Sequence, residues 1–131
     1  MNDFELINQL AETSKDLLWQ SESDFPFKTV YWEDVDDIEI KLLELTDNTP
    51  DKTIEVKELD EFFNRVTKEE DWYNEEEMLI CKRYQELVNL LQTHLTDIKV
   101  YRVGDVEVNC YILGKTKSGA IAGLSTISVE T

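Results

Sequence analysis

The chain has 131 residues and a formal net charge of −16, because 29 Asp and Glu outnumber 13 Lys and Arg. This length predicts a single domain over residues 1–131 with one substantial core, and a hydrophobic share of 41% argues against disorder. So negative a charge argues against direct contact with nucleic acid or an anionic membrane and favours a basic partner. No apolar stretch approaches the roughly 20 residues of a transmembrane helix, and the first residues lack a secretion signal, so we expect a cytoplasmic protein.

The excess negative charge lies mostly in the middle of the chain. Residues 33–51 hold eight acids and one base, residues 55–77 hold ten acids and three bases, and residues 97–131 hold four of each. A charge of about 2–8 units is enough to keep a small domain soluble, and −16 is well beyond that range. Two explanations of the excess charge stay open. It could create a field that attracts a basic partner, or the chain could be an ordinary acidic cytoplasmic or halotolerant protein.

The N-terminal segment is predicted to be helical. Apolar residues recur at three- and four-residue steps over residues 3–19, which is typical of an amphipathic helix, and Asn2 or Asp3 can cap its first amide groups. Residues 21–27 break this period, and Pro26 disfavours helix at the residue before it. We expect a loop there.

The next segment is predicted to be β-structure. Residues 27–33 are rich in β-formers and predict a strand. Residues 38–42 alternate apolar and polar side chains, which predicts a half-buried strand, and residues 47–51 have the composition of a turn. A short third strand is expected over residues 53–56.

Two helices and three strands are predicted for the rest of the chain. Residues 58–66 form a short helix, and the long helix after it can start at a capping box on either Thr67 or Asn74. Gly123 interrupts the last strand, which indicates a bulge or a close approach of backbones. Three helices beside six short strands predict an α+β fold built in layers. The three C-terminal strands are expected over residues 99–103, 106–113 and 120–129.

The sequence gives little sign of catalysis. The single histidine, His94, lies near the end of the long helix, where the helix dipole favours it without any catalytic role. Cys81 and Cys110 lack metal-ligand or redox spacing, so we expect two reduced thiols, with one disulfide in an exported protein as the alternative. Nucleophile-elbow, phosphate-loop, dinucleotide and zinc motifs are missing. We therefore expect no catalytic residue, no cofactor and no enzymatic activity, although a hydrolase that uses its many acids stays open.

Three features suggest contact with another protein. Glu22 stands between two serines in the loop that precedes Phe25-Pro26-Phe27. Trp72 lies in an acidic stretch, and aromatic residues ringed by charge often anchor interfaces. The last strand runs to Glu130 and Thr131, where it could hold a terminal carboxylate, a group that binds hard metal ions. Each feature also has a structural explanation: a capped turn, a staple at a helix start, or a chain that ends on a strand.

These same segments resemble the nuclease A inhibitor family, in order and in spacing, over nearly the whole chain. Asp24 and Phe25 are conservative departures from Glu and Tyr in the family pattern, and residues 35–53 show no recognisable match. The matching segments are Leu17-Leu18, Ser21-Glu22-Ser23-Asp24-Phe25-Pro26-Phe27, Trp32-Glu33, Phe62-Phe63-x-Arg65, Asp71-Trp72-Tyr73, Val100-Tyr101-Arg102-Val103-Gly104-Asp105-Val106-Glu107, Ala122-Gly123-Leu124-Ser125-Thr126 and Val129-Glu130-Thr131.

The resemblance implies a fold, a partner and the residues that contact it. The fold is a three-layer α/β/α sandwich with a mostly antiparallel central sheet and pathogenesis-related-1-like topology. The partner is a magnesium-dependent, sugar-non-specific endonuclease of the ββα-metal class, bound tightly and one to one by an inhibitor that is monomeric when free. Glu22 would pair with a nuclease arginine, Trp72 would pack at the interface, and Thr131 would reach the nuclease-bound magnesium ion. Glu130 is also expected among the partner-binding residues. An acidic module that sequesters another basic DNA-binding protein is the alternative.

Overall fold

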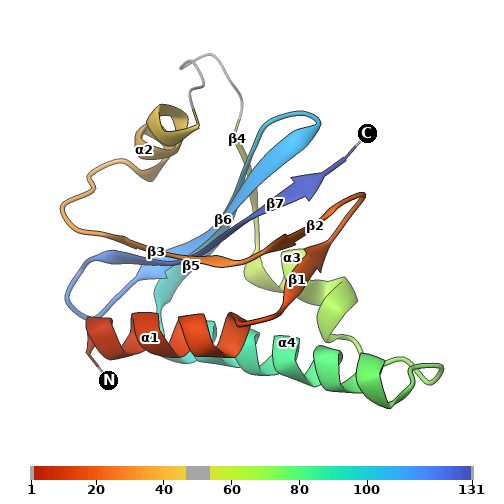
Figure 1. Cartoon of the computed structure of the whole chain (residues 1–131). Coiled ribbons are helices and arrows are strands. Elements are labelled where there is room, and N and C mark those ends of the chain that lie inside the picture. The colour runs from red at the N-terminus through yellow and green to blue at the C-terminus, as the bar shows by residue number, and fades with distance from the viewer. Residues whose placement is uncertain (1, 47–53, 131) are drawn as a thin grey trace.

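The computed structural model describes residues 2–46 and 54–130. Five strands form one sheet in the order β3-β7-β6-β5-β4, with all neighbours antiparallel, and β1 and β2 form a separate hairpin beside it (Figure 1). The elements follow the order α1 (Asp3–Ser14), β1 (Leu18–Gln20), β2 (Asp24–Pro26), β3 (Lys28–Trp32), α2 (Ile38–Leu45), β4 (Ile54–Lys57), α3 (Leu59–Thr67), α4 (Glu75–His94), β5 (Thr96–Val103), β6 (Glu107–Lys115) and β7 (Ile121–Val129).

Helices cover both faces of the sheet. Ile112 points into a large core cluster beneath α1, α3 and α4, and its neighbour Leu113 points into a smaller cluster beneath α2. Figure 1 shows α1 and α4 on one side of the sheet and α2 on the other. The predicted α+β fold, with an antiparallel sheet between two helical layers, is therefore confirmed. The pathogenesis-related-1-like topology remains a prediction of the resemblance.

Side-chain caps define where two of the helices begin. Asn2 Oδ1 accepts a hydrogen bond from the Glu5 amide at 2.8 Å, so Asn2 is the cap of α1. Asn74 and Glu77 form a complete capping box, with each side chain bonded to the other residue's backbone N–H at 2.8 and 3.2 Å. The long helix therefore begins after Asn74 and not after Thr67, since Thr67 belongs to the end of α3.

The predicted helix over residues 3–19 is wrong in its last turn. Asp16 adopts a left-handed backbone with φ of +65°, which a helix does not continue. Leu17 is then buried in the core, and Leu18–Gln20 form β1. The loop expected over residues 21–27 is also shorter, because Asp24–Pro26 pair with β1 as strand β2.

The strand predicted over residues 38–42 is a helix. Asp37 caps it, accepting a hydrogen bond from the Ile40 amide at 3.2 Å. Ile38 and Leu42, four residues apart, face the sheet, whereas Ile40 is 57% exposed. Five residues can satisfy a period of two and a helical period at once, so the alternation was ambiguous. The turn predicted over residues 47–51 lies outside the described residues, as does the first residue of the strand expected over 53–56.

The remaining predicted strands are confirmed, with small shifts at their ends. Residues 27–33 contain β3, and the C-terminal strands are β5, β6 and β7. β5 begins three residues early, at Thr96, and its register against β6 shifts between Thr96 and Lys99. Over residues 2–46 and 54–130, every helix is too short or too polar to cross a lipid bilayer.

Candidate partner-binding surface

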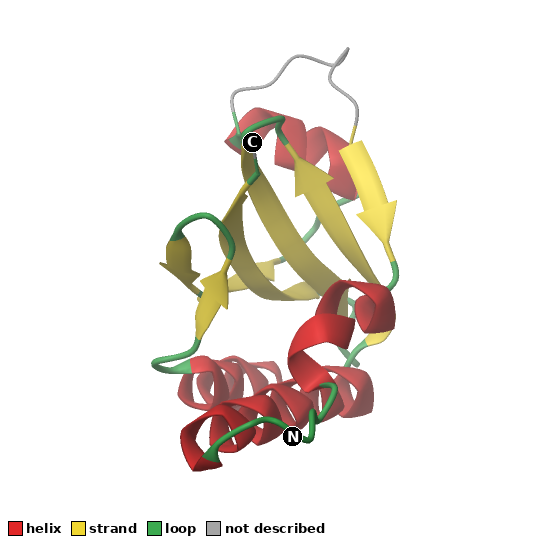
Figure 2. Cartoon of the chain, turned by 90° about the vertical axis from the view of Figure 1, so that its right-hand side faces the viewer, coloured by secondary structure: helices red, strands yellow, loops and turns green. Residues whose placement is uncertain are grey.

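An open groove of about 600 Å³ lies where the β1–β2 hairpin, α3 and the end of β7 meet. These elements face the viewer in Figure 2. The groove contains two of the four predicted contact residues, Glu22 and Glu130, together with three cations for which no role was predicted: Lys57, Arg65 and Arg102.

The loop that carries Glu22 is bound to the end of β7. The Ser21 hydroxyl accepts a hydrogen bond from the Val129 amide at 2.9 Å and donates one to the Ser23 carbonyl at 2.8 Å. The Glu22 amide donates to the Val129 carbonyl oxygen at 3.3 Å. Glu22 is therefore an exposed acid on a fixed backbone, beside the strand that leads to the other predicted contacts.

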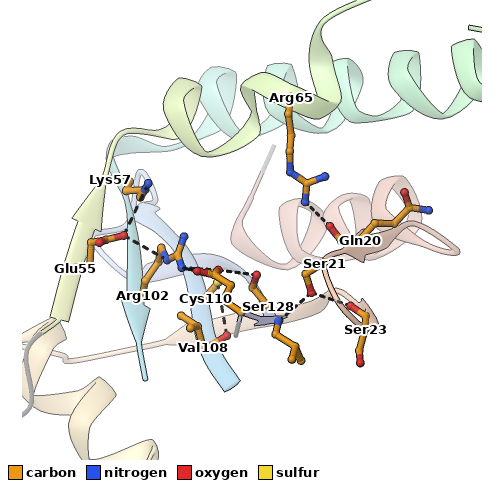
Figure 3. A network of polar contacts seen from close by, with 12 residues as sticks. Gln20, Ser21, Ser23, Glu55, Lys57, Arg65, Arg102, Val108, Cys110 and Ser128 are labelled. Atoms are coloured by element: carbon orange, nitrogen blue, oxygen red, sulfur yellow. Dashed lines mark hydrogen bonds and ion pairs between the residues drawn. The ribbon is translucent and has the colours of Figure 1, made fainter. Parts of the chain in front are cut away.

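The hairpin behind this loop is fixed by side chains from two helices. Tyr84 of α4 donates its hydroxyl to the Leu18 carbonyl at 2.6 Å, and Arg65 of α3 donates to the Gln20 carbonyl (Figure 3). The Arg65 guanidinium also lies 4.5 Å from the ring centre of Trp19, which stacks on Phe62 with ring centres 4.3 Å apart. Polar and aromatic contacts thus stabilise a two-stranded hairpin that would be only marginally stable by itself.

Glu130 is bound within its own chain. Arg102 Nη2 lies 2.5 Å from both Glu130 carboxylate oxygens, and the Ser128 hydroxyl donates to Glu130 Oε2 at 2.8 Å. Burial by itself would raise the pKa of Glu130, but the hydrogen bonds from Arg102 and Ser128 outweigh it and lower the pKa. The network continues from Arg102 to Glu55 and Lys57, as the dashed lines in Figure 3 show.

Trp72 lies outside the groove, in the connection between α3 and α4. Its side chain is 71% exposed and its ring lies edge-on to Tyr73, with ring centres 4.7 Å apart. This connection, the hairpin and the end of β7 all lie on the right-hand side of Figure 1, the side that faces the viewer in Figure 2. The fold therefore presents the Glu22 loop, Glu130 and the Trp72 connection on one side of the molecule. Thr131 lies outside the described residues.

The single histidine and the two cysteines lie outside the groove and have structural roles. His94 is in the last turn of α4, as the sequence suggested. Cys81 and Cys110 are both buried and free, so the disulfide alternative is wrong. Burial raises the pKa of the Cys110 thiol to about 12, which keeps it protonated at neutral pH. In the described part of the chain, His, Cys, Asp and Glu residues form no group of three or more that could hold a metal ion.

Comparison with known families identifies the chain. A family model described as nuclease A inhibitor-like protein matches residues 4–131. This protein belongs to that family. No curated protein matches the sequence significantly. Membership implies a nuclease-inhibitor role and a nuclease as partner.

The family assignment leaves several residues of the groove without a sequence-based role. The sequence could have indicated a structural role for Arg102. It lies two residues from Val100, on the same face of β5, whereas Val103 faces the other core cluster. A charged residue on the core side of a strand is stable only when an opposite charge pairs with it. The sequence cannot name Glu130 as that counter-charge, since the two residues are 28 positions apart. Ser21 gave no signal beyond its place next to Glu22.

Proposed function

We propose that this member of the nuclease A inhibitor-like family is a tight, non-covalent, one-to-one inhibitor of a magnesium-dependent, sugar-non-specific endonuclease of the ββα-metal class. The family match over residues 4–131 carries the proposal. The inhibitor occludes the nuclease active site with an acidic surface and is not itself an enzyme. Glu22 and Trp72 contact the nuclease, Glu130 belongs to the same surface, and the Thr131 carboxylate reaches the nuclease-bound magnesium ion.

Charge and shape have separate roles in this mechanism. A nuclease binds polyanionic substrate, so its active site combines a basic groove with a metal ion, and a protein of net charge −16 is attracted to it. Such steering raises association rates by roughly 10–1,000-fold at low salt and fades beyond a Debye length of about 8 Å at physiological salt. Tight binding then depends on contacts that are ordered beforehand, and the bonds from Ser21 and Glu22 to Val129 supply that order.

Titration of a purified endonuclease of this class tests the proposal directly. Residual DNA cleavage is measured as the inhibitor is added at nuclease concentrations well above the expected dissociation constant. Cleavage should fall linearly and reach its minimum at about one equivalent of inhibitor. Unreduced cleavage at a large excess would contradict the proposal, and binding to the nuclease without loss of cleavage would contradict active-site occlusion.

Association should slow as salt is added. Raising sodium chloride from about 0.05 to 0.5 M shortens the Debye length severalfold, so we expect the association rate constant to fall by at least tenfold while the dissociation rate changes little. Stopped-flow fluorescence at several salt concentrations measures both rates. An association rate that does not depend on salt would contradict charge steering.

Substitution of Trp72 by Ala should weaken inhibition at little cost to stability. Buried Trp side chains at interfaces commonly contribute 2 kcal/mol or more, roughly a 30-fold change in affinity. Because the side chain is 71% exposed in the free protein, its removal should change the free energy of unfolding by about 0.5 kcal/mol at most. Phe4→Ala is the matched control, since Phe4 is an aromatic residue of 75% exposure at the start of α1. Equal inhibition by both variants would remove Trp72 from the interface.

A further inference from the structure

We infer that Arg102 is a positioning residue for inhibition: by binding Glu130 it fixes the end of β7, and the Glu22 loop bound to that strand, as one preformed contact surface. Glu130 then acts through Arg102 and not by touching the nuclease. This inference rests on the proposed function and adds Arg102, to which neither the sequence nor the family match assigned a role in inhibition.

The first support is that the Glu130 carboxylate is already engaged inside the protein. Both of its oxygens lie 2.5 Å from Arg102 Nη2, and Oε2 also accepts a hydrogen bond from Ser128. The charge of this carboxylate is already paired with Arg102, so a cation on another protein would gain less from it than from an unpaired carboxylate. The arrangement therefore favours an internal role for Glu130.

The second support is that Arg102 is well placed to act as a fixed anchor. Its side chain is only 17% exposed and lies on the core side of β5, where Glu55 on the neighbouring strand β4 approaches its Nε to 3.4 Å. Because β5 is an inner strand of the sheet, with β4 on one side and β6 on the other, the backbone of Arg102 is rigid. The Arg102 side chain, paired with Glu55, can therefore restrain the segment that carries Glu130.

The third support is that the restrained segment also holds the Glu22 loop. Val129 exchanges backbone and hydroxyl bonds with Ser21 and Glu22, and the Glu130 amide donates to the Val106 carbonyl at 2.8 Å. The strand end is thus held by the loop after β5, by Arg102 and by the Glu22 loop together. If Arg102 releases Glu130, the support beneath Glu22 loosens as well.

The test compares two substitutions that remove one positive charge from the same groove. Arg102→Met breaks the bond to Glu130, whereas Lys57→Met is the matched control, because Lys57 pairs with Glu55 at 3.8 Å and makes no bond to residues 128–130. We expect Arg102→Met to raise the dissociation rate of the nuclease complex by about tenfold or more, and Lys57→Met by less than about twofold. Both should alter the association rate to the same small extent, since both change the net charge equally.

Two further measurements separate positioning from direct contact and from unfolding. In the free protein, ¹⁵N relaxation should show greater mobility of the Val129 and Glu130 amides in Arg102→Met than in Lys57→Met, with the core amides unchanged. Glu130→Gln should also raise the dissociation rate, and the double variant Arg102→Met/Glu130→Gln should be no worse than Arg102→Met alone. Additive losses in the double variant would mean that Glu130 touches the nuclease and would overturn its positioning role.

The outcomes distinguish this inference from the proposed function. A wild-type protein that fails to inhibit overturns the proposed function. A wild-type protein that inhibits, with an Arg102→Met complex that dissociates no faster than the Lys57→Met complex, overturns the inference alone. Arg102→Met amides as rigid as those of the wild type overturn it too, because the strand end then needs no anchor.

Discussion

Glu22→Ala is expected to weaken nuclease inhibition by more than tenfold and to leave the fold intact. Two hydrogen bonds to Val129, one at the Ser21 hydroxyl and one from the Glu22 amide, hold this exposed acid in place before binding, so little conformational entropy is lost when it meets a basic group. Removal of one partner of a close interfacial charge pair commonly costs 2–5 kcal/mol, and tenfold corresponds to about 1.4 kcal/mol. Inhibition constants from residual DNA cleavage measure the effect, and thermal unfolding verifies the fold.

Glu39→Ala is the control for this experiment. Glu39 is an exposed acid on α2, on the opposite side of the sheet from α3, the helix that borders the groove. Its removal changes the net charge by the same unit. It should slow association slightly and leave dissociation unchanged. If Glu22→Ala and Glu39→Ala behave alike, Glu22 contributes only to the long-range field and is not a contact residue.

Deletion of Thr131 is expected to weaken inhibition by more than tenfold as well, because the resemblance assigns its carboxylate to the nuclease-bound metal ion. The deletion leaves the Arg102–Glu130 pair in the chain, so the two effects can be measured separately. If neither this deletion nor Glu22→Ala changes potency, the proposed contact residues are wrong even though the protein inhibits.

Gly123→Ala is expected to be the most destabilising small substitution, with a loss of roughly 3 kcal/mol or more in the free energy of unfolding. A methyl group at this position would lie 1.8 Å from the carbonyl oxygen of Ile112, inside the van der Waals radii, and the backbone φ of +156° is unfavourable for an L-residue. Gly123 lies in β7, where it pairs with Val30 of β3 on one side and with Leu113 of β6 on the other. Its backbone therefore cannot move aside without disturbing the sheet.

Gly119→Ala provides the comparison. Gly119 also has a positive φ, of +89°, but a methyl group there would meet nothing within 4 Å. Its substitution should therefore cost only the backbone strain, about 1–2 kcal/mol. Urea unfolding of both variants measures the difference. A Gly123→Ala protein no less stable than Gly119→Ala would show that the sheet absorbs the close approach at no cost.

Sequence patterns predicted the fold well where the signal is local. The capping box of Asn74 and Glu77 spans four residues and defined one of two possible starts for α4. The long apolar stripe of α4 and the turn-separated strands at the C-terminal end were also confirmed. Prediction failed at Ile38–Leu45, where a short alternating stretch is compatible with both a strand and a helix. The Asp37 cap and the sheet face beneath Leu42 select the helix.

The candidate surface also combines features that the sequence determines with features that only the tertiary structure decides. The sequence by itself determined its charge, its exposed acid at Glu22 and its aromatic residue at Trp72, because these are properties of single residues or short segments. Only the tertiary structure decided that Ser21 holds Val129 across 108 positions and that Arg102 holds Glu130 across 28. Strand order and register bring these pairs within hydrogen-bond distance, and both depend on the packing of all the layers together. The residues that attract a basic partner can thus be identified from the sequence, whereas the residues that order the contact surface can be identified only from the tertiary structure.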